Sequence, residues 1–217
     1  MVAASVLSIF IACNVWAQLV PLGTPLKNRG YEQIKFKRGV RAYKHRSSSN
    51  IRIGAEGVMA APLPEVEKAL FDFERQVGKV DRLVESKILA RGENWLVVYQ
   101  RLNLPMINDR DFVLFVRRSI ADNITTIAFH VVSKRGPAPR KGVVRVKLHQ
   151  GAWQLRPTSD GEGTYARFLT TIDLGGMLPK WMARAGAGSE LPRLFSAICK
   201  MACNPSQRSG TCLSKCR

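Results

Sequence analysis

The chain has 217 residues, 46% of them hydrophobic, and a formal net charge of +18. This length is slightly above that of an average domain and too short for two, so we expect one core with appendages. The excess of positive charge disfavours a cationic partner and favours membrane phosphates or nucleic acid. A basic surface that serves only solubility is the simpler alternative.

Residues 1–17, MVAASVLSIFIACNVWA, form an uncharged apolar run that ends in Val15-Trp16-Ala17. Such an ending is typical of a signal peptidase site, and the run is shorter than the roughly 20 apolar residues of a membrane-spanning helix. We expect a signal peptide cleaved after Ala17 and an exported protein, periplasmic or secreted, that associates with membranes. Because no Lys or Arg precedes the run, an uncleaved anchor is the alternative.

A basic lead-in, residues 18–38, is expected to be loosely attached, and a short strand follows it. The alternating segment IRIGAEGVM predicts a further strand. A helix is expected to begin at Pro62-Leu63-Pro64, because proline is tolerated in a first turn. Its apolar stripe at helical spacing predicts a core-facing side formed by Val66, Ala69, Leu70 and Phe73.

The middle of the chain predicts an antiparallel meander. Strand-like runs are WLVVYQRLNL, DFVLFVRRSI, ITTIAFHVV, GVVRVKLH, AWQLRP and TYARFLTTIDL, with turn signals such as Asp122-Asn123 and Asp160-Gly161 between them. In GVVRVKLH the alternation predicts a dry face with Val144, Val146 and Leu148. The other face is expected to be wet and basic, with Arg145, Lys147 and His149.

The C-terminal region predicts a helix from about Met177 to Ala202, bent or broken near Gly186, Gly188 and Pro192. A cysteine-rich tail, residues 202–217, follows. Cys199 and Cys203 lie around the start of this tail, and Cys212 and Cys216 lie near its end. Each of these two pairs has a spacing of four residues, which places both members on one helical face. Two antiparallel helices would then form a hairpin with the nested disulfides Cys199 to Cys216 and Cys203 to Cys212. A zinc site formed by the four thiolates is the alternative, although export favours disulfides.

A long, curved antiparallel sheet packed by one C-terminal helix encloses more space than its own side chains fill, which predicts an α+β grip around a ligand. Three motifs in order sharpen this prediction: NDRDFV from Asn108, KGVVR from Lys141 and DLGGMLPKWM from Asp173. Together with the order of elements, they resemble the START family of lipid-transfer domains. The resemblance covers residues 39–201.

The resemblance implies a helix-grip fold, in which a curved antiparallel sheet wraps around the C-terminal helix and leaves an internal tunnel for one lipid or sterol. It implies lipid binding or transfer without covalent chemistry. Met106 and Ile107 would lie in a lid beside the tunnel mouth, and the start of the last helix would form its gate. The residues assigned to the ligand are Tyr99, Arg101, Met106, Ile107, Phe112, Leu114, His130, Trp153, Phe168, Met177, Leu178, Trp181 and Met182.

The sequence departs from the family pattern at one pair of charges. Members with a buried acid in the strand before RDF pair it with an arginine, but here that strand has Arg101, and Val116 stands in the arginine's place. We therefore expect Tyr99, Arg101 and His130 to supply the polar contacts inside the tunnel. The pair Arg110 and Asp111 is expected to hold its loop.

No catalytic site, metal site or cofactor is expected. The three histidines have no metal-ligand spacing and no neighbouring nucleophile motif. The expected partners are a lipid ligand and an anionic membrane surface, bound by a monomer. Nucleic acid is not expected, because GVVRVKLH offers no base-stacking aromatic residue. The alternatives are a basic interaction module and a polyketide-cyclase-like enzyme on the same scaffold.

Overall fold

The computed structural model describes residues 20–46, 50–132, 135–176 and 180–203, together with Ser214 and Cys216; of residues 180–189 it describes the backbone alone. The elements in chain order are η2 (Leu26–Arg29), β1 (Tyr31–Lys37), β2 (Val40–His45), β3 (Ile51–Met59), α1 (Leu63–Phe71), η3 (Glu74–Gln76), β4 (Leu83–Arg91), β5 (Trp95–Leu102), β6 (Asp109–Ala121), β7 (Ile124–Val131), β8 (Val143–Arg145), β9 (Leu148–Pro157), β10 (Thr164–Asp173) and α2 (Lys180–Ala202).

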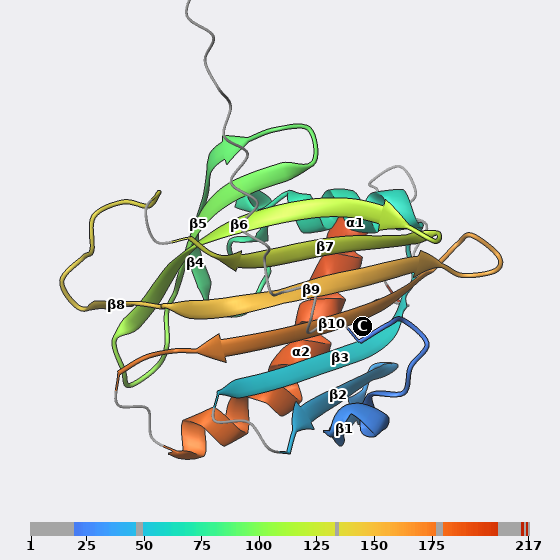
Figure 1. Ribbon diagram of the computed structural model, residues 1–217, viewed down its shortest axis with the longest axis horizontal. Helices are drawn as coiled ribbons and strands as arrows, with labels where there is room; N and C mark the ends of the chain where they lie inside the picture. Colours follow the sequence, from blue (N-terminus) through green and yellow to red (C-terminus); the bar gives the residue numbers. More distant parts are fainter. Residues whose placement is uncertain are drawn as a thin grey trace, which may run out of the picture.

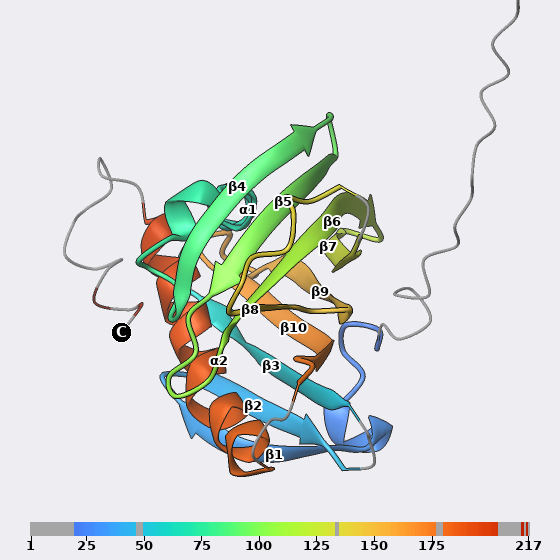
Figure 2. The same ribbon diagram turned by 90° about the vertical axis from the view of Figure 1, so that its left-hand side faces the viewer.

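One antiparallel sheet organises the described part of the chain. Its strand order is β1-β2-β3-β10-β9-β7-β6-β5-β4, and the short β8 pairs in parallel with the start of β6 (Figure 1). The sheet curves around α2 (Figure 2). This architecture is the α+β helix-grip arrangement, as predicted.

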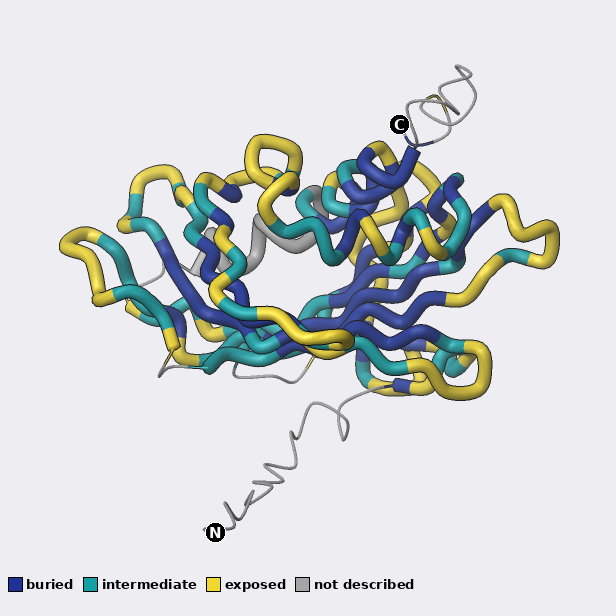
Figure 3. Tube along the Cα trace, turned by 90° about the horizontal axis from the view of Figure 1, so that it is seen from above, coloured by how far each residue is buried: buried dark blue, intermediate teal, exposed yellow. Residues whose placement is uncertain are grey.

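The two helices lie on the concave side of the sheet. α2 packs against β2, β3 and α1, at the end of the sheet that carries the first strands. The residues where the helices and strands meet are buried, and the exposed residues lie in the outer turns (Figure 3). Since α2 covers only one part of the concave face, the part formed by β5, β6, β7 and β9 faces a cavity.

Helix α1 is the helix predicted at the Pro62-Leu63-Pro64 sequence. Proline fits its first turn because those backbone positions need no intrahelical donor. Val66, Ala69 and Leu70 are buried, as their spacing predicts. On the other side of the helix, Glu67 accepts hydrogen bonds from the side chains of Arg118 on β6 (2.7 Å) and Thr125 on β7 (2.6 Å). The helix is thus fixed to the sheet by a polar contact as well as by its apolar stripe.

The segment before β2 is more firmly attached than predicted. β1 lies inside the predicted lead-in and pairs with β2 in the main sheet. Val20 and Leu26 are buried in one cluster with Tyr43 and Leu169, and Arg167 donates a hydrogen bond to the carbonyl of Pro21 (2.9 Å). The prediction of a loosely attached lead-in is therefore wrong for the described residues, because β1 pairs with the main sheet and the apolar residues before and at its start are buried.

The run GVVRVKLH is not one strand. β8 ends at Arg145 and β9 begins at Leu148, so the alternation is interrupted at Val146-Lys147. Val146 is buried in the main core, but His149 also faces the concave side, where it contacts Phe112 and Phe129. The predicted wet face is wrong for His149, because the interruption reverses the face on which the following residues lie. β4, which no sequence pattern predicted, forms the other end of the sheet.

α2 is a single helix that contains Pro192, so of the two predicted alternatives, a bend or a break, the break does not occur. A disulfide joins Cys199 in α2 to Cys216, with 5.6 Å between their Cα atoms, as in the predicted nested pairing. Cys212, the predicted partner of Cys203, lies outside the described residues, as does the predicted signal peptide. None of the helices in the described ranges is both long enough and apolar enough to cross a membrane.

Candidate ligand-binding cavity

A cavity of about 280 Å³ lies between the concave face of the sheet and the helices. Most of its wall is apolar. The sheet contributes Ile53, Leu83, Leu102, Phe112, Leu114, Val116, Ile127, Phe129, Trp153, Phe168 and Ile172, and the helical side contributes Leu70, Phe73, Val80, Leu191, Leu194 and Ile198. The cavity is thus built as an apolar compartment inside the grip.

Four residues assigned to the ligand from the sequence line this cavity: Phe112, Leu114, Trp153 and Phe168. Alternate residues of a strand share a face, so Phe112 and Leu114 of β6 point to the same side. The Trp153 ring lies 4.7 Å from the ring of Phe168 and 5.0 Å from that of Phe195 on α2. These aromatic contacts connect β9, β10 and α2 and fix one wall of the cavity.

The three polar residues expected inside the cavity lie on the opposite face of the sheet. Gln100 lines the cavity, so its strand neighbours Tyr99 and Arg101 face the other way. His130 likewise alternates with Phe129, and its ring contacts Phe115. The prediction that these residues face the cavity is wrong, because composition alone did not fix which alternate set of each strand faces inward.

The remaining residues assigned to the ligand lie at or beyond the limits of the described structure. Met106 and Ile107 belong to the loop between β5 and β6, outside the cavity wall; Met106 is 81% exposed and has a positive φ of 65°. Met177 and Leu178 lie outside the described residues. For Trp181 and Met182 only the backbone, at the start of α2, is described.

Several polar side chains in the cavity wall are satisfied by protein groups. Gln76 donates to the carbonyls of Ala69 and Leu70, at 3.3 and 3.2 Å. Gln100 donates to the hydroxyl of Ser86, and the Thr170 hydroxyl donates to the carbonyl of Gln150. Buried polar groups with such partners stabilise the fold without requiring a ligand.

His149 is the exception in the cavity wall, and its role was missed from the sequence. Its Nδ1 is buried without a hydrogen-bond partner. Burial lowers its pKa from 6.5 to about 4, because the interior disfavours the charged imidazolium. His149 as a whole is half-buried and lines the cavity. The clean alternation of GVVRVKLH gave no sign of the interruption between β8 and β9 that sets its position.

Two ion pairs lie at one rim of the cavity. Arg82 donates to Glu190 (3.3 Å), and Arg193 donates to Asp81 (3.0 Å). Both pairs connect the segment before β4 with α2, and both acids belong to the cavity wall. Since all four side chains are partly exposed, we expect the pairs to be weak and readily opened.

Arg110 connects the two sequence motifs that flank the cavity. Its guanidinium donates to the carbonyls of Leu174 (3.2 Å) and Gly175 (3.0 Å), and also to that of Asn108. The arginine of NDRDFV thereby holds the backbone of DLGG, in the connection from β10 to α2. Gly175 and the following Gly176 have φ of 62° and 68°, a left-handed conformation that glycine adopts without strain.

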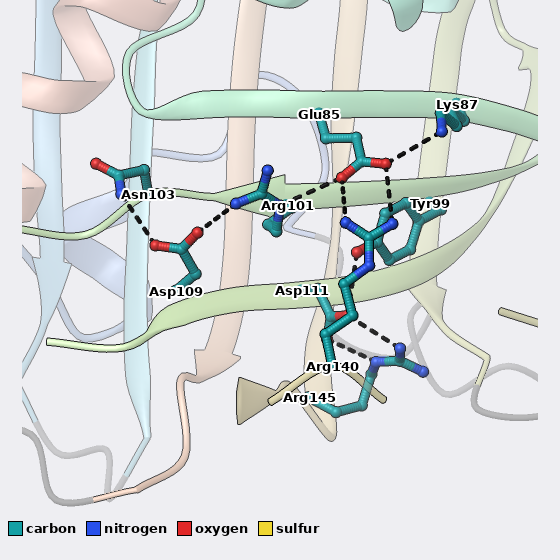
Figure 4. Close-up of polar contacts among 9 residues, drawn as sticks. All are labelled: Glu85, Lys87, Tyr99, Arg101, Asn103, Asp109, Asp111, Arg140 and Arg145. Carbon is teal, nitrogen blue, oxygen red and sulfur yellow. Dashed lines mark hydrogen bonds and ion pairs between the residues drawn. The ribbon is translucent and has the colours of Figure 1, made fainter. Parts of the chain in front are cut away.

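A charge network covers the outer face of β4, β5 and β6 (Figure 4). Asp111, with a side chain only 1% exposed, accepts two hydrogen bonds from Arg145 (2.6 and 2.9 Å) and one from the Tyr99 hydroxyl (3.2 Å). Glu85 is bound by Arg140, Lys87 and Arg101, and its contact with Arg140 is the largest cause that lowers its pKa to about 2. The network joins the β8 segment to the sheet on the side away from the cavity.

The comparisons with known proteins agree with this geometry. The family model described as "START domain" matches residues 79–206, which is more than half of the chain. The chain belongs to the START domain family. The matched range includes Arg110, the cavity-lining strands β5, β6, β7, β9 and β10, and α2, so the START domain contains most of the cavity wall.

Solved structures show the same fold at low sequence identity. A STAR-related lipid transfer protein from Xanthomonas axonopodis has a TM-score of 0.73 at 21% identity, over 81% of this chain and 99% of that one. Human STARD10 has a TM-score of 0.72 at 18% identity, over 84% and 77% of the two chains. The Zhui aromatase/cyclase from Streptomyces sp. R1128 has a TM-score of 0.54 at 17% identity, over 73% and 97%. No curated protein sequence matches this chain.

In this START domain the ion pair between Asp111 and Arg145 lies outside the cavity. Asp111 and Arg145 lie on the outer face, whereas the family pattern considered from the sequence places an acid and an arginine behind the tunnel entrance. Among the described residues that line the cavity, none is a Lys or Arg. No group of three or more metal-ligating side chains occurs in the part of the chain searched, which is the described part.

A basic groove of about 560 Å³ lies next to the cavity. Five cationic residues from the β1–β2 turn, the η3 region and α2 contribute to it: Arg38, Arg75, Lys79, Arg193 and Lys200. Asp81 is the acid in the groove and lines the cavity as well. The groove and the cavity therefore meet at the ion pair between Asp81 and Arg193.

Proposed function

We propose that the protein binds one hydrophobic ligand in the cavity and carries it without covalent chemistry. The observation that supports this function is a mostly apolar cavity of about 280 Å³ whose wall is formed by sheet and helix together. Ligand pockets are typically concave, mostly apolar and lined by a few polar groups. Membership of the START domain family supports a lipid as the class of ligand.

The experiment that tests this function fills the cavity. Leu114 on β6 lines the cavity, whereas Ile120 on the same strand is 59% exposed. We expect Leu114→Trp to weaken binding of the neutral fluorescent probe N-phenylnaphthylamine at least tenfold and Ile120→Trp to leave it unchanged. Circular dichroism would confirm that both variants fold. Equal probe binding by the wild type and Leu114→Trp would contradict the proposal.

The aromatase/cyclase fold relative makes catalysis the second candidate function. The two functions differ in the fate of the ligand. A carrier returns its lipid with unchanged mass, so extraction and mass spectrometry of lipid bound during expression should recover only compounds that are present in the host membranes. Recovery of a compound that forms only in the presence of the protein would favour the enzyme.

We also propose that the basic groove docks the protein on an anionic membrane surface. Each Lys or Arg near such a surface contributes about 1 kcal/mol. Docking there would bring the rim formed by Asp81 and Arg193 close to the lipid headgroups. The five cations of the groove come from three separate parts of the chain, which favours a surface built by the fold over a charged tail.

Vesicle flotation tests the docking proposal. The variant Arg38→Glu with Lys200→Glu should bind phosphatidylserine-containing vesicles at least tenfold more weakly, because two attractive contacts are lost. The control Arg91→Glu with Lys147→Glu has the same change of charge at exposed positions outside the groove. Binding that is equal for the two variants, or that does not fall as salt is raised, would contradict docking through this groove.

Export to an oxidising compartment, as a monomer, is part of the proposal. The disulfide between Cys199 and Cys216 supports it, since disulfides persist outside the reducing cytosol. Cell fractionation and gel mobility with and without reductant would test it. A cytosolic protein with fully reduced cysteines would contradict this location.

A further inference from the structure

The imidazole of His149 is a polar group that its protein surroundings leave unsatisfied. Its ring centroid lies 4.8 Å from that of Phe112 and 5.1 Å from that of Phe129, both in edge-to-face geometry. Its Nδ1 is buried and accepts or donates no hydrogen bond. The neighbouring Gln100 and Thr170, by contrast, each donate to a protein oxygen. The two phenylalanine rings pack edge-to-face against the imidazole and offer its Nδ1 no hydrogen-bond partner.

The ring of His149 is neutral at physiological pH. Burial lowers the pKa of the imidazole to about 4. A neutral imidazole has one N–H donor and one acceptor nitrogen, so it suits a hydroxyl or a carbonyl group. It offers no charge with which to hold a carboxylate or a phosphate.

The rest of the described cavity wall agrees with an uncharged ligand. The wall has no Lys or Arg among its described residues. Its acids, Asp81 and Glu190, lie at the rim and are paired with Arg193 and Arg82. A charged headgroup inside would remain unpaired in apolar surroundings, which is strongly unfavourable.

We propose that His149 recognises the single polar group, a hydroxyl or a carbonyl, of a compact uncharged amphiphile whose apolar part fills the cavity. This inference rests on the proposed function, since it names the ligand class of the same cavity. The volume of about 280 Å³ lies at the small end of ligand pockets, which favours a ligand with one compact apolar body over a two-chain phospholipid.

The experiment compares two ligands that differ by one hydroxyl group. n-Octanol and n-octane are titrated against bound N-phenylnaphthylamine, and the measured quantity is the ratio of their affinities. If His149 forms one hydrogen bond with the hydroxyl group, His149→Phe should lower the ratio of n-octanol affinity to n-octane affinity about five- to tenfold relative to the wild type. His149→Gln, which retains hydrogen-bonding capacity, should keep part of the preference. The control is His130→Phe, on the opposite face of the sheet, and it should leave the ratio unchanged.

A second measurement needs no variant. The histidine ring-nitrogen NMR resonances of the wild-type protein should respond to n-octanol at one histidine and respond less to n-octane. If neither compound displaces the probe, the proposed function itself fails. If both compounds displace the probe but their affinity ratio is the same in the wild type and His149→Phe, the role of His149 is overturned. The same holds if His130→Phe lowers the ratio as much as His149→Phe does. Octanoate that binds as tightly as n-octanol would overturn the inference of an uncharged ligand.

Discussion

Asp111 is a buried polar residue and His149 a half-buried one, on opposite faces of one sheet, and their polar atoms have different partners. Asp111 is charged and receives three hydrogen bonds, from Arg145 and Tyr99. His149 has aromatic neighbours and remains neutral. The contacts of Asp111 stabilise the fold, because both oxygens of its carboxylate accept hydrogen bonds from the protein. The contacts of His149 leave its Nδ1 without a hydrogen-bond partner from the protein.

We predict that His149 makes the fold sensitive to mild acid. The pKa of its imidazole is about 4 in the folded protein, against 6.5 for the free group. As the pH falls from 6.5 to 4, this imidazole becomes protonated in the unfolded chain but stays neutral in the folded protein. The free energy of unfolding therefore falls. The loss approaches roughly 3 kcal/mol below pH 4.

Urea unfolding between pH 7 and pH 4 measures this loss. His149→Phe should show a smaller decline than the wild type. The pKa values of His45 and His130 are also lowered by burial, but both residues are present in each protein and their effects cancel in the comparison. Glu85, with a pKa of about 2, acts mainly in a lower window, between about 4.5 and 2. Equal declines for the two proteins would contradict the prediction.

We predict that Arg145→Met destabilises the protein by about 3 kcal/mol. The substitution leaves the carboxylate of Asp111 buried with only the Tyr99 hydroxyl as a side-chain partner, and removal of one member of a buried pair is costly. Urea unfolding at neutral pH measures the change. The matched control is Arg140→Met, whose contact with Glu85 is exposed and should contribute at most about 1 kcal/mol. Equal losses of stability from the two substitutions would show that the buried pair of Asp111 contributes no more than the exposed pair of Glu85.

At the scale of the elements, Arg110 joins the start of β6 to the connection between β10 and α2. Its side chain replaces the missing backbone partners of Leu174 and Gly175 at a place where the chain leaves the sheet. The residue itself is 2% exposed. The position of this connection, and with it the approach to α2, therefore depends on a residue more than 60 positions earlier in the chain.

We predict that Arg110→Met loosens this connection. Loss of the three carbonyl contacts should raise hydrogen exchange in peptides that cover Leu174 and Gly175 and should lower stability by about 2 kcal/mol. Exchange followed by mass spectrometry measures the first effect. Arg117→Met, at an exposed position of the same strand, is the control. Unchanged exchange in the connection would show that other contacts hold it.

The elements with a regular pattern could be predicted from the sequence, and the inward set of each strand could not. Ile51–Met59 and the helix after Pro62 alternate or repeat clearly, so their structure follows from local chemistry. In β5 both alternate sets contain apolar and polar residues, Val97 and Tyr99 on one face and Val98 and Gln100 on the other. Since both faces of this strand are covered, the choice depends on tertiary packing, and Tyr99 was assigned to the wrong side.

At the scale of the whole molecule, the positive charge and the binding sites are separate features. The charge of +18 is spread over the chain, yet the described cavity wall contains no basic residue. Cations collect in the groove at the end of α2 instead. Repulsion among these like charges opposes the compact state.

We predict that moderate salt stabilises the protein. Screening weakens the repulsion among the excess positive charges more than it weakens the few partly buried ion pairs. The midpoint of thermal unfolding should therefore rise by a few degrees between low and physiological ionic strength, as differential scanning fluorimetry would measure. The variant Arg38→Glu with Lys200→Glu, which has a lower net charge, should show a smaller rise. A midpoint that falls with salt would indicate that ion pairs dominate.

The interruption between β8 and β9 has an evolutionary consequence. Arg145 and His149 are four positions apart, a spacing that would place them on one face of an uninterrupted strand. They lie on opposite faces because Val146-Lys147 departs from the strand. A single insertion or deletion at this point would exchange the residues that β9 presents to the cavity while leaving the composition of the chain almost unchanged. Ligand preference in such a domain can thus diverge through a change of register, which brings a different set of existing β9 residues to the cavity.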